Sequence, residues 1–241
     1  MLAPMARGID EWVGTRTGQR LARGLIDYFS ATITGADHVP RRGGALLVGN
    51  HGVFGLDAFI LAALLARDVG RMPTWLGERH LWATPLLPRA LDFVGAIEGE
   101  PEAATRHLSR GELVVVYPGG IHDSFKPASE RHRLQWGSRA GFARVAMRAR
   151  VPVVPVAACG VDDAYRVVAR EPGLGRLLFG DARYNFPIVL GRRGTLLPRR
   201  VPVSFHVLAP IDTRGDVAMA DDVERVRAAT HDALTQVLSR H

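Results

Sequence analysis

A histidine and an aspartate, His51 and Asp57, lie on either side of the pentapeptide Gly-Val-Phe-Gly-Leu. The glycines allow a tight turn, in which the Asp57 carboxylate could accept the Nδ1 proton of His51. The Nε2 atom of His51 would then be free to take a proton from a hydroxyl group near neutral pH, as a general base does. The same spacing also fits an ordinary polar contact, so the pair alone leaves both interpretations open.

A second candidate for chemistry is the sequence Tyr117-Pro118-Gly119-Gly120, which follows an apolar run. The backbone N–H groups of glycine can approach a bound group closely, because no Cβ intervenes. We therefore expect Gly119 and Gly120 to hold an oxyanion, with Asn50, Tyr117 and Pro118 lining the same substrate site. The alternative is a tight turn between a strand and a loop, which a Pro-Gly-Gly sequence forms in any case.

Short apolar runs alternate with segments of helical periodicity, and these elements would position both motifs. The apolar runs are predicted to be buried strands at 45–48, 93–97, 113–117, 151–157 and 201–208. Helices are predicted at 15–29, 56–66, 78–91, 101–109, 136–148 and 222–238, the last capped by Asp221 or Asp222. This alternation predicts an α/β fold with a mixed, largely parallel central sheet flanked by helices. Ligands of such folds bind at the carboxyl ends of the strands, where both motifs lie.

Four features follow one another along the chain: Asn50-His51, Asp57 on the next turn, a strand ending in Pro118-Gly119, and the sequence Val-Pro-Val-Val-Pro-Val from residue 151. This order resembles the glycerolipid acyltransferase superfamily, which lysophosphatidate acyltransferases typify. The sequence Tyr-Pro-Gly-Gly from residue 117 and the segment 136–143 are similar to a branch that includes diacylglycerol-acyltransferase-like and phytyl-ester-synthase-like proteins. The resemblance covers about residues 37–210 and implies a layered acyltransferase fold.

The resemblance implies transfer of a fatty acyl group from an acyl thioester, either acyl-CoA or an acyl-carrier protein, to a lipid hydroxyl. His51 would remove the proton of that hydroxyl, and Asp57 would orient the imidazole. No acyl-enzyme is implied, and the sequence has no Gly-x-Ser-x-Gly motif to supply a serine nucleophile. We expect no cofactor beyond this co-substrate. We also expect no metal ion, since the single cysteine, Cys159, cannot supply a Cys-based zinc site.

Three departures from the superfamily pattern bear on the acceptor. Five residues separate His51 from Asp57, as in the named branch, where the superfamily usually has four. The segment 95–100 reads Gly-Ala-Ile-Glu-Gly-Glu, with acids where a phosphate-binding arginine is common, and Gly119 replaces a common glutamate. These departures favour a neutral hydroxyl, that of a mono- or diacylglycerol or a long-chain alcohol. The alternative is a lysophospholipid or glycerol-phosphate acyltransferase.

The composition of the 241 residues, 47% hydrophobic and 23% charged, excludes a disordered chain and a disulfide-stapled miniprotein. The formal net charge is +7, and Lys126 is the only lysine among the basic residues. Arginine binds phosphates in a bidentate fork, so anionic lipids, phosphorylated co-substrates and nucleic acid are possible partners. The codon bias of a GC-rich bacterial genome explains the excess of arginine equally well.

The N-terminal segment 1–35 is predicted to be an amphipathic helical segment that precedes an acyltransferase domain at 36–241. Arg16, Arg20 and Arg23 share one face of the helix, and Leu21, Leu25, Tyr28 and Phe29 share the opposite face. We expect the arginines to contact anionic headgroups and Leu21, Leu25 and Phe29 to enter the acyl boundary of a membrane. The alternative is that the apolar face packs on the domain and the arginines are solvated.

A second basic segment surrounds the sequence Gly-Thr-Leu-Leu-Pro. Arg192 and Arg193 precede it, and Arg199 and Arg200 follow it. Their functional interpretation is contact with the phosphates of the acyl donor or with lipid headgroups. The alternative is a solvated loop.

The sequence shows neither a signal peptide nor an apolar run of the roughly 20 residues that span a bilayer. We therefore expect a cytoplasmic protein that lies peripherally on a membrane or lipid droplet. Two other classes stay open: a non-catalytic module that binds membrane or nucleic acid, and a thioesterase that uses water as acceptor. Nucleic acid is not expected, because the arginines are not interleaved with aromatic residues in a recognisable pattern.

Overall fold

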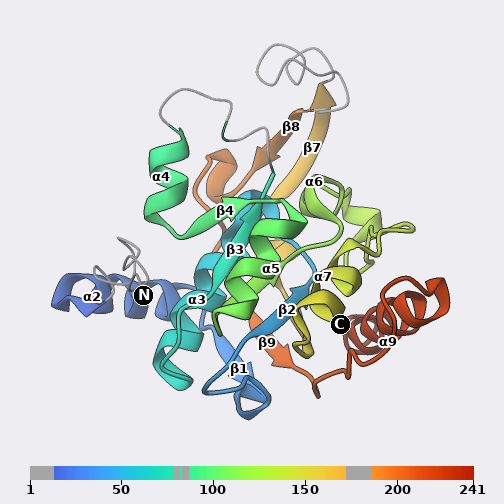
Figure 1. The fold of residues 1–241 in the computed structure, drawn as a ribbon. Coiled ribbons are helices and arrows are strands. Elements are labelled where there is room, and N and C mark those ends of the chain that lie inside the picture. Colours follow the sequence, from blue (N-terminus) through green and yellow to red (C-terminus); the bar gives the residue numbers. More distant parts are fainter. Residues whose placement is uncertain (1–13, 79–81, 83–86, 172–185) are drawn as a thin grey trace.

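The structure, a computed structural model, describes residues 14–78, 82, 87–171 and 186–241. Its centre is a seven-stranded sheet with the strand order β1-β9-β6-β2-β5-β3-β4 (Figure 1). The five strands from β6 to β4 in this order are parallel, β9 is antiparallel to β6, and β1 is parallel to β9. The predicted α/β fold with a mixed, largely parallel sheet is confirmed. The strands are β1 (Thr32–Thr34), β2 (Ala45–Gly49), β3 (Thr74–Gly77), β4 (Ala96–Glu98), β5 (Leu113–Val116), β6 (Val153–Cys159) and β9 (Ser204–Val207).

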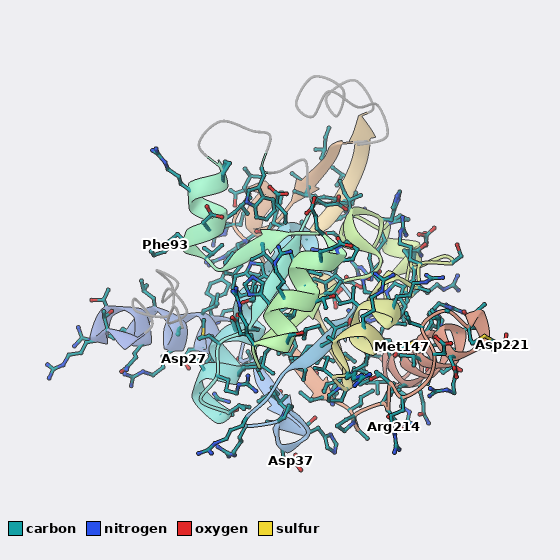
Figure 2. All side chains as sticks on the ribbon, viewed as in Figure 1. Asp27, Asp37, Phe93, Met147, Arg214 and Asp221 are labelled. Atoms are coloured by element: carbon teal, nitrogen blue, oxygen red, sulfur yellow. The ribbon has the colours of Figure 1, made fainter. Side chains whose placement is uncertain are left out.

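Helices cover both faces of this sheet. Those that contribute to the core on one face are α2 (Arg16–Tyr28) and α3 (Leu56–Asp68), and those on the other are α5 (Pro101–Ser109), α7 (Gly141–Ala149) and α9 (Ala220–Leu238). Figure 1 shows α5 and α7 in front of β2, with α9 beside them. Met147 of α7 is buried in this second core, and Figure 2 shows it near α9. The protein is therefore a layered structure with the sheet in the middle.

The central strands are buried on both faces, which explains why their sequences are continuously apolar. In β2, Ala45 and Leu47 belong to the core under α2 and α3, whereas Leu46 and Val48 belong to the core under α5, α7 and α9. All four side chains are fully buried. Because β2 is held from both faces, the residues that follow its carboxyl end are positioned by a rigid element.

Several element boundaries differ from the sequence prediction. The predicted strand 93–97 is split: Phe93 ends α4 (Leu87–Phe93), residues 94 and 95 form a turn, and only Ala96 and Ile97 of the run enter β4. Of the predicted helix 78–91, residues 79–81 and 83–86 lie outside the described residues. α7 begins at Gly141 rather than at residue 136. Neither Asp221 nor Asp222 caps α9, because the N-cap residue is Met219 and the Asp222 carboxylate accepts a hydrogen bond from the backbone N–H of Asp216 instead.

Residues 14–35 pack on the rest of the described chain. α2 lies against α3, and Phe29, which is 1% exposed, belongs to the core shared with α3. β1 follows α2 and extends the central sheet through its pairing with β9. Residues of α2 and the segment after it therefore share a core with α3 and the central sheet.

A smaller, two-stranded sheet stands apart from the central one. It consists of β7 (Arg166–Glu171) and β8 (Phe186–Leu190), which are antiparallel (Figure 1). A 3₁₀ turn (Arg192–Gly194) follows β8 and leads toward β9. This small sheet thus connects the end of β6 with the basic segment around residues 192–200.

Candidate active site

The turn from Asn50 to Asp57, named here the His51 turn, lies at the carboxyl edge of the central sheet. β2 ends at Gly49, a short 3₁₀ turn (Val53–Gly55) follows, and α3 begins at Leu56. Phe54 and Gly55 both adopt left-handed backbone conformations, with φ of 58° and 69°. This reversal brings the first turn of α3 back to the end of β2, as a glycine at position 55 allows. The chain thus places Asp57 beside His51.

The geometry of the pair matches the sequence prediction. His51 Nδ1 lies 3.1 Å from Asp57 Oδ2, and Asp57 Oδ1 accepts a hydrogen bond of 2.9 Å from the backbone N–H of Gly52. The Asp57 side chain is 0% exposed, whereas that of His51 is 20% exposed. A buried carboxylate with a second donor is held in one orientation, at the helix N-terminus that favours its charge. It therefore favours the tautomer in which Nδ1 carries the proton, which leaves Nε2 with a lone pair that can accept one.

The surroundings set the pKa of His51. Burial lowers this pKa, but the charge of Asp57 and its hydrogen bond raise it more, with a further contribution from Asp123. The net result is a pKa above the ordinary value of 6.5. A base with a raised pKa accepts a proton more readily, provided that the pH is high enough to keep it neutral.

Asn50 has a different place from the one expected. Its amide Nδ2 donates to the carbonyl of Ala158, and its Oδ1 accepts from the N–H of the same residue. Both polar groups of the buried side chain thus engage the backbone of β6. Asn50 therefore ties the His51 turn to the neighbouring strand, and the expectation that it lines a substrate site is corrected.

Tyr117 and the two glycines also have structural contacts. The Tyr117 ring stacks on the His51 imidazole, with centroids 4.2 Å apart. Its buried hydroxyl forms no hydrogen bond among the described residues, and burial together with the Asp57 charge raises its pKa well above 10.0. The N–H of Gly120 donates to the Tyr117 carbonyl at 2.9 Å, so this amide is not free for an oxyanion. The described hydrogen bonds leave only the Gly119 N–H for that role, and Pro118 is half-buried beside it.

A buried ionic cluster holds the His51 turn from the other side, and sequence reasoning did not identify it. Asp123 accepts hydrogen bonds from the backbone N–H of His51 at 3.0 Å and from Lys126 Nζ at 3.3 Å. Lys126 Nζ also lies 3.1 Å from Asp162, and Ser124 Oγ donates to the carbonyl of Gly52. A solitary lysine three positions after an aspartate was the available signal. The segment 119–133 is thereby clamped onto the turn that carries His51.

Acidic side chains lie along the same edge of the sheet. Glu98 ends β4, and Glu78 follows β3, whose neighbour is β5. Glu78 Oε1 is 3.1 Å from the position that a Cβ on Gly120 would occupy. The acids noted in the segment 95–100 therefore continue toward the glycines at the end of β5, and negative charge accumulates there.

Nearly all arginines of both predicted basic segments, α2 and the segment after β8, are exposed. Arg16, Arg20 and Arg23 are exposed, but Phe29 and Leu25 pack into the core, which corrects the expectation that these two side chains enter a membrane. Arg192 and Arg193 are exposed as well. Within the described ranges, no helix combines the length and the apolar character that crossing a bilayer requires.

One group of potential metal ligands occurs away from the His51 turn. Cys159, His206 and His241 have ligand atoms within 4.8 Å of one another. Both imidazole nitrogens of His206 already lie within hydrogen-bond distance of hydroxyls, those of Thr34 and Ser204. Burial raises the pKa of the Cys159 thiol to about 11, which disfavours the thiolate that a metal needs.

Comparison with known proteins gives consistent matches. An uncharacterized protein of Mycobacterium tuberculosis is 30% identical over 209 residues, which cover 86% of this chain and 55% of that protein. The human "DGAT1/2-independent enzyme synthesizing storage lipids" is 28% identical over 159 residues, 66% of this chain and 48% of the relative. The chain thus spans about half the length of the curated relatives it matches.

A solved structure shares the fold. It is that of the 1-acyl-sn-glycerophosphate (LPA) acyltransferase PlsC from Thermotoga maritima, with a TM-score of 0.55 and 13% identity over 95% of this chain and 86% of that one. The sequence model of the acyltransferase family matches residues 30–158, a span that contains His51, Asp57 and the glycines after β5. This match extends over more than half of the chain, which therefore belongs to the acyltransferase family.

Proposed function

We propose that the protein transfers a fatty acyl group from an acyl thioester to a lipid hydroxyl, with His51 as the general base. The observation that carries the proposal is the 3.1 Å contact between His51 Nδ1 and the fully buried Asp57. Family membership supports the reaction class. The partly exposed imidazole at the carboxyl edge of a largely parallel sheet supports the assignment of the base.

The reaction follows from this geometry in two proton transfers. The acceptor hydroxyl gives its proton to His51 Nε2 as its oxygen attacks the thioester carbonyl, and Asp57 stabilises the resulting imidazolium. The tetrahedral intermediate carries a negative oxygen, for which we propose the Gly119 N–H as a donor. The C–S bond then breaks, and the leaving thiolate recovers the proton from His51. No covalent enzyme intermediate forms, so a single base serves both steps.

We propose a neutral acceptor, such as a mono- or diacylglycerol or a long-chain alcohol. Glu78 follows β3, the neighbour of β5, and Glu98 ends β4, the next strand outward, and their charges would repel the phosphate of a lysophosphatidate or glycerol phosphate. The curated relatives named for the synthesis of storage lipids support the same choice. Such acceptors are insoluble, so the protein would meet them at the surface of a membrane or lipid droplet.

The test is thioester consumption with a panel of acceptors. Purified protein is given acyl-CoA or acyl-carrier protein with a diacylglycerol, a long-chain alcohol, a lysophosphatidate or water alone, and both released thiol and acylated product are measured. Faster product formation with a neutral acceptor than with lysophosphatidate is expected. A preference for lysophosphatidate would overturn the neutral acceptor, and thiol release that does not depend on acceptor would indicate a thioesterase.

A second arm separates the enzyme from a binding module. Folded His51→Gln protein should bind the acyl donor but lose transfer, because glutamine cannot take up a proton at Nε2. Equal transfer by this variant and the parent would remove His51 from the mechanism. Absence of turnover by the parent on the whole panel, together with DNA binding that weakens with salt, would favour the non-catalytic alternative.

A further inference from the structure

A compact turn with outward-facing leucines lies between β8 and β9. It comprises residues 192–200, Arg-Arg-Gly-Thr-Leu-Leu-Pro-Arg-Arg, and is named here the leucine turn. Leu196 is 70% exposed and Leu197 is 65% exposed, the largest values among the exposed large apolar side chains of the described residues. Adjacent leucines that face water at this level mark a surface that contacts something apolar.

The leucine turn is built by hydrogen bonds. The Gly191 N–H donates to the Thr195 carbonyl and the Arg192 N–H donates to the Leu197 carbonyl, both at 2.7 Å. The Leu197 N–H donates to Thr195 Oγ1. These backbone groups are therefore satisfied within the turn, as entry into an apolar phase requires.

Two tyrosines fasten the leucine turn to the body of the protein. Tyr165 Oη donates to the Leu196 carbonyl at 3.0 Å, and Tyr28 Oη, at the end of α2, donates to the Pro198 carbonyl at 2.8 Å. Because these carbonyls point inward, the Leu196 and Leu197 side chains are presented outward on a fixed frame. The exposure of Leu196 and Leu197 is therefore set by the hydrogen bonds that hold the backbone of the turn.

Charge around the leucines identifies the partner as an anionic surface. Arginines flank them on both sides, and residues 182–211 contain no aspartate or glutamate. Arg192, Arg193 and Arg200 are exposed, and none of them forms an ion pair with a carboxylate in the described part of the chain. A protein partner would need a matching acidic rim around an apolar pocket. A bilayer with anionic lipids offers both kinds of contact, because its headgroups bind arginine and its acyl chains accommodate leucine.

The leucine turn is also connected to the candidate site. The Tyr165 ring that holds it makes an edge-to-face contact with Phe54, with centroids 5.5 Å apart. Phe54 lies between His51 and Asp57 in sequence and is 48% exposed. Tyr165 thus connects the backbone of the leucine turn with the turn that carries His51.

We infer that the leucine turn is the membrane-docking element of the protein, with Leu196 and Leu197 entering the headgroup boundary of an anionic bilayer and the flanking arginines contacting its phosphates. The inference rests on the proposed function in one respect, that the acceptor is a lipid. It assigns to this turn the insertion into the membrane that the sequence alone assigned to α2, where Leu25 and Phe29 pack in the core and only Leu21 of the apolar face is exposed.

Flotation with vesicles tests the inference. The probes are vesicles of phosphatidylcholine alone and of phosphatidylcholine mixed with phosphatidylglycerol. The triple variant Arg192→Glu, Arg193→Glu, Arg200→Glu should bind the mixed vesicles on the order of 100-fold more weakly, since each basic residue at such a surface contributes a factor of about five. The matched control is Arg16→Glu, Arg20→Glu, Arg23→Glu on α2, which has the same change in net charge and should lose less than about tenfold.

The apolar part needs its own variant. Leu196→Ser, Leu197→Ser should reduce binding to the mixed vesicles about tenfold or more and leave the melting temperature unchanged, because both side chains are exposed. Equal binding by parent and this variant would overturn the inference, as would a larger loss for the α2 control than for the leucine-turn arginines. Transfer activity is measured separately. Vesicle binding through the turn without acyl transfer would contradict the proposed function only.

Insertion can be observed directly. In Leu196→Cys protein, a polarity-sensitive maleimide dye should label only the new cysteine, because Cys159 is buried and its thiol pKa is about 11. The dye emission should shift to the blue with the mixed vesicles. No shift on vesicles that the protein demonstrably binds would place the contact elsewhere.

Discussion

Two of the histidine–carboxylate pairs in the described part of the chain have nearly the same contact distance. His51 Nδ1 lies 3.1 Å from Asp57, and His107 Nδ1 lies 2.9 Å from Glu112. The first pair follows the carboxyl end of β2, whereas the second joins the end of α5 to the residue before β5, at the amino edge of the sheet. Distance between the two partners therefore does not distinguish them.

The surroundings of the two carboxylates distinguish the pairs. Asp57 is fully buried and holds a second hydrogen bond, from the Gly52 N–H, while Glu112 is 20% exposed. Tyr117 stacks on the His51 ring, and Asp123 holds the His51 backbone. A carboxylate can fix an imidazole for catalysis only if the carboxylate is itself fixed. Enclosure and position at the sheet edge are therefore the features that distinguish the proposed catalytic pair from the second polar contact.

The largest expected effect is a difference in transfer activity between variants of the two histidines. His51→Ala should reduce kcat/KM for acyl transfer by about 10²- to 10⁴-fold, since a positioned base is lost. His107→Ala, at the opposite edge of the sheet, should change it less than about twofold. Circular dichroism and thermal melting check that both variants are folded. Similar losses for the two would show that the pairs are not distinct in function.

The next effect concerns the buried ionic cluster of Asp123, Lys126 and Asp162, which holds the turn of the first pair. Lys126→Met should lower the free energy of unfolding by about 3–5 kcal/mol, because Asp123 and Asp162 would be left buried without their cation. Urea unfolding measures this difference. Lys126→Met combined with Asp123→Asn should be less destabilised than the single variant, because only Asp162 would then be left without its cation. Destabilisation of less than 1 kcal/mol by the single change would mean that the cluster does not hold the site.

A third prediction uses the pH dependence. His51 must be neutral to act as a base, and its pKa is raised above 6.5, so kcat/KM should fall as the pH drops through that raised pKa. Asp57→Asn removes the charge that raises the pKa and leaves the opposing effect of burial. The acidic limb of the profile should therefore move to lower pH, with a reduced plateau. A limb that stays in place would show that another group titrates.

The smallest effect is expected at the second pair. Glu112→Gln should change the free energy of unfolding by less than about 1 kcal/mol, because a partly exposed ion pair contributes little. The matched change Asp57→Gln should cost more, since it places a longer side chain in a fully buried position. Paired urea titrations compare the two. A larger loss from Glu112→Gln would reverse the ranking.

The sequence predicted the central part of the fold well because its signals there are strong. The helix 101–109 was placed correctly by Pro101 at its start and Gly111 just beyond its end, and the β2 and β5 runs are too apolar to be anything but buried. The short strands β1 and β3 carry no such signal. They are strands because a neighbouring strand offers hydrogen bonds, which local sequence does not show.

The candidate site was predictable only where contacts are local in sequence. His51 and Asp57 are joined by one turn, so their spacing indicated the pair. Asn50 reaches a residue 108 positions away, and Asp123 reaches His51 across 72 positions. Such contacts depend on which strands become neighbours, and for this reason the substrate role expected for Asn50 was wrong and the Asp123 cluster was missed.

The burial of Lys126 protects its ε-amine from acylation while the protein is folded. It is the only lysine in the chain, and its side chain is 2% exposed. Acyl thioesters acylate free amines without any enzyme, so a protein that handles them works in the presence of a lysine-modifying reagent. Here the ε-amine is kept charged between two carboxylates and out of reach. Each acylated Lys126 found by mass spectrometry would therefore record one opening of the segment that clamps the His51 turn, a natural counter that needs no added label.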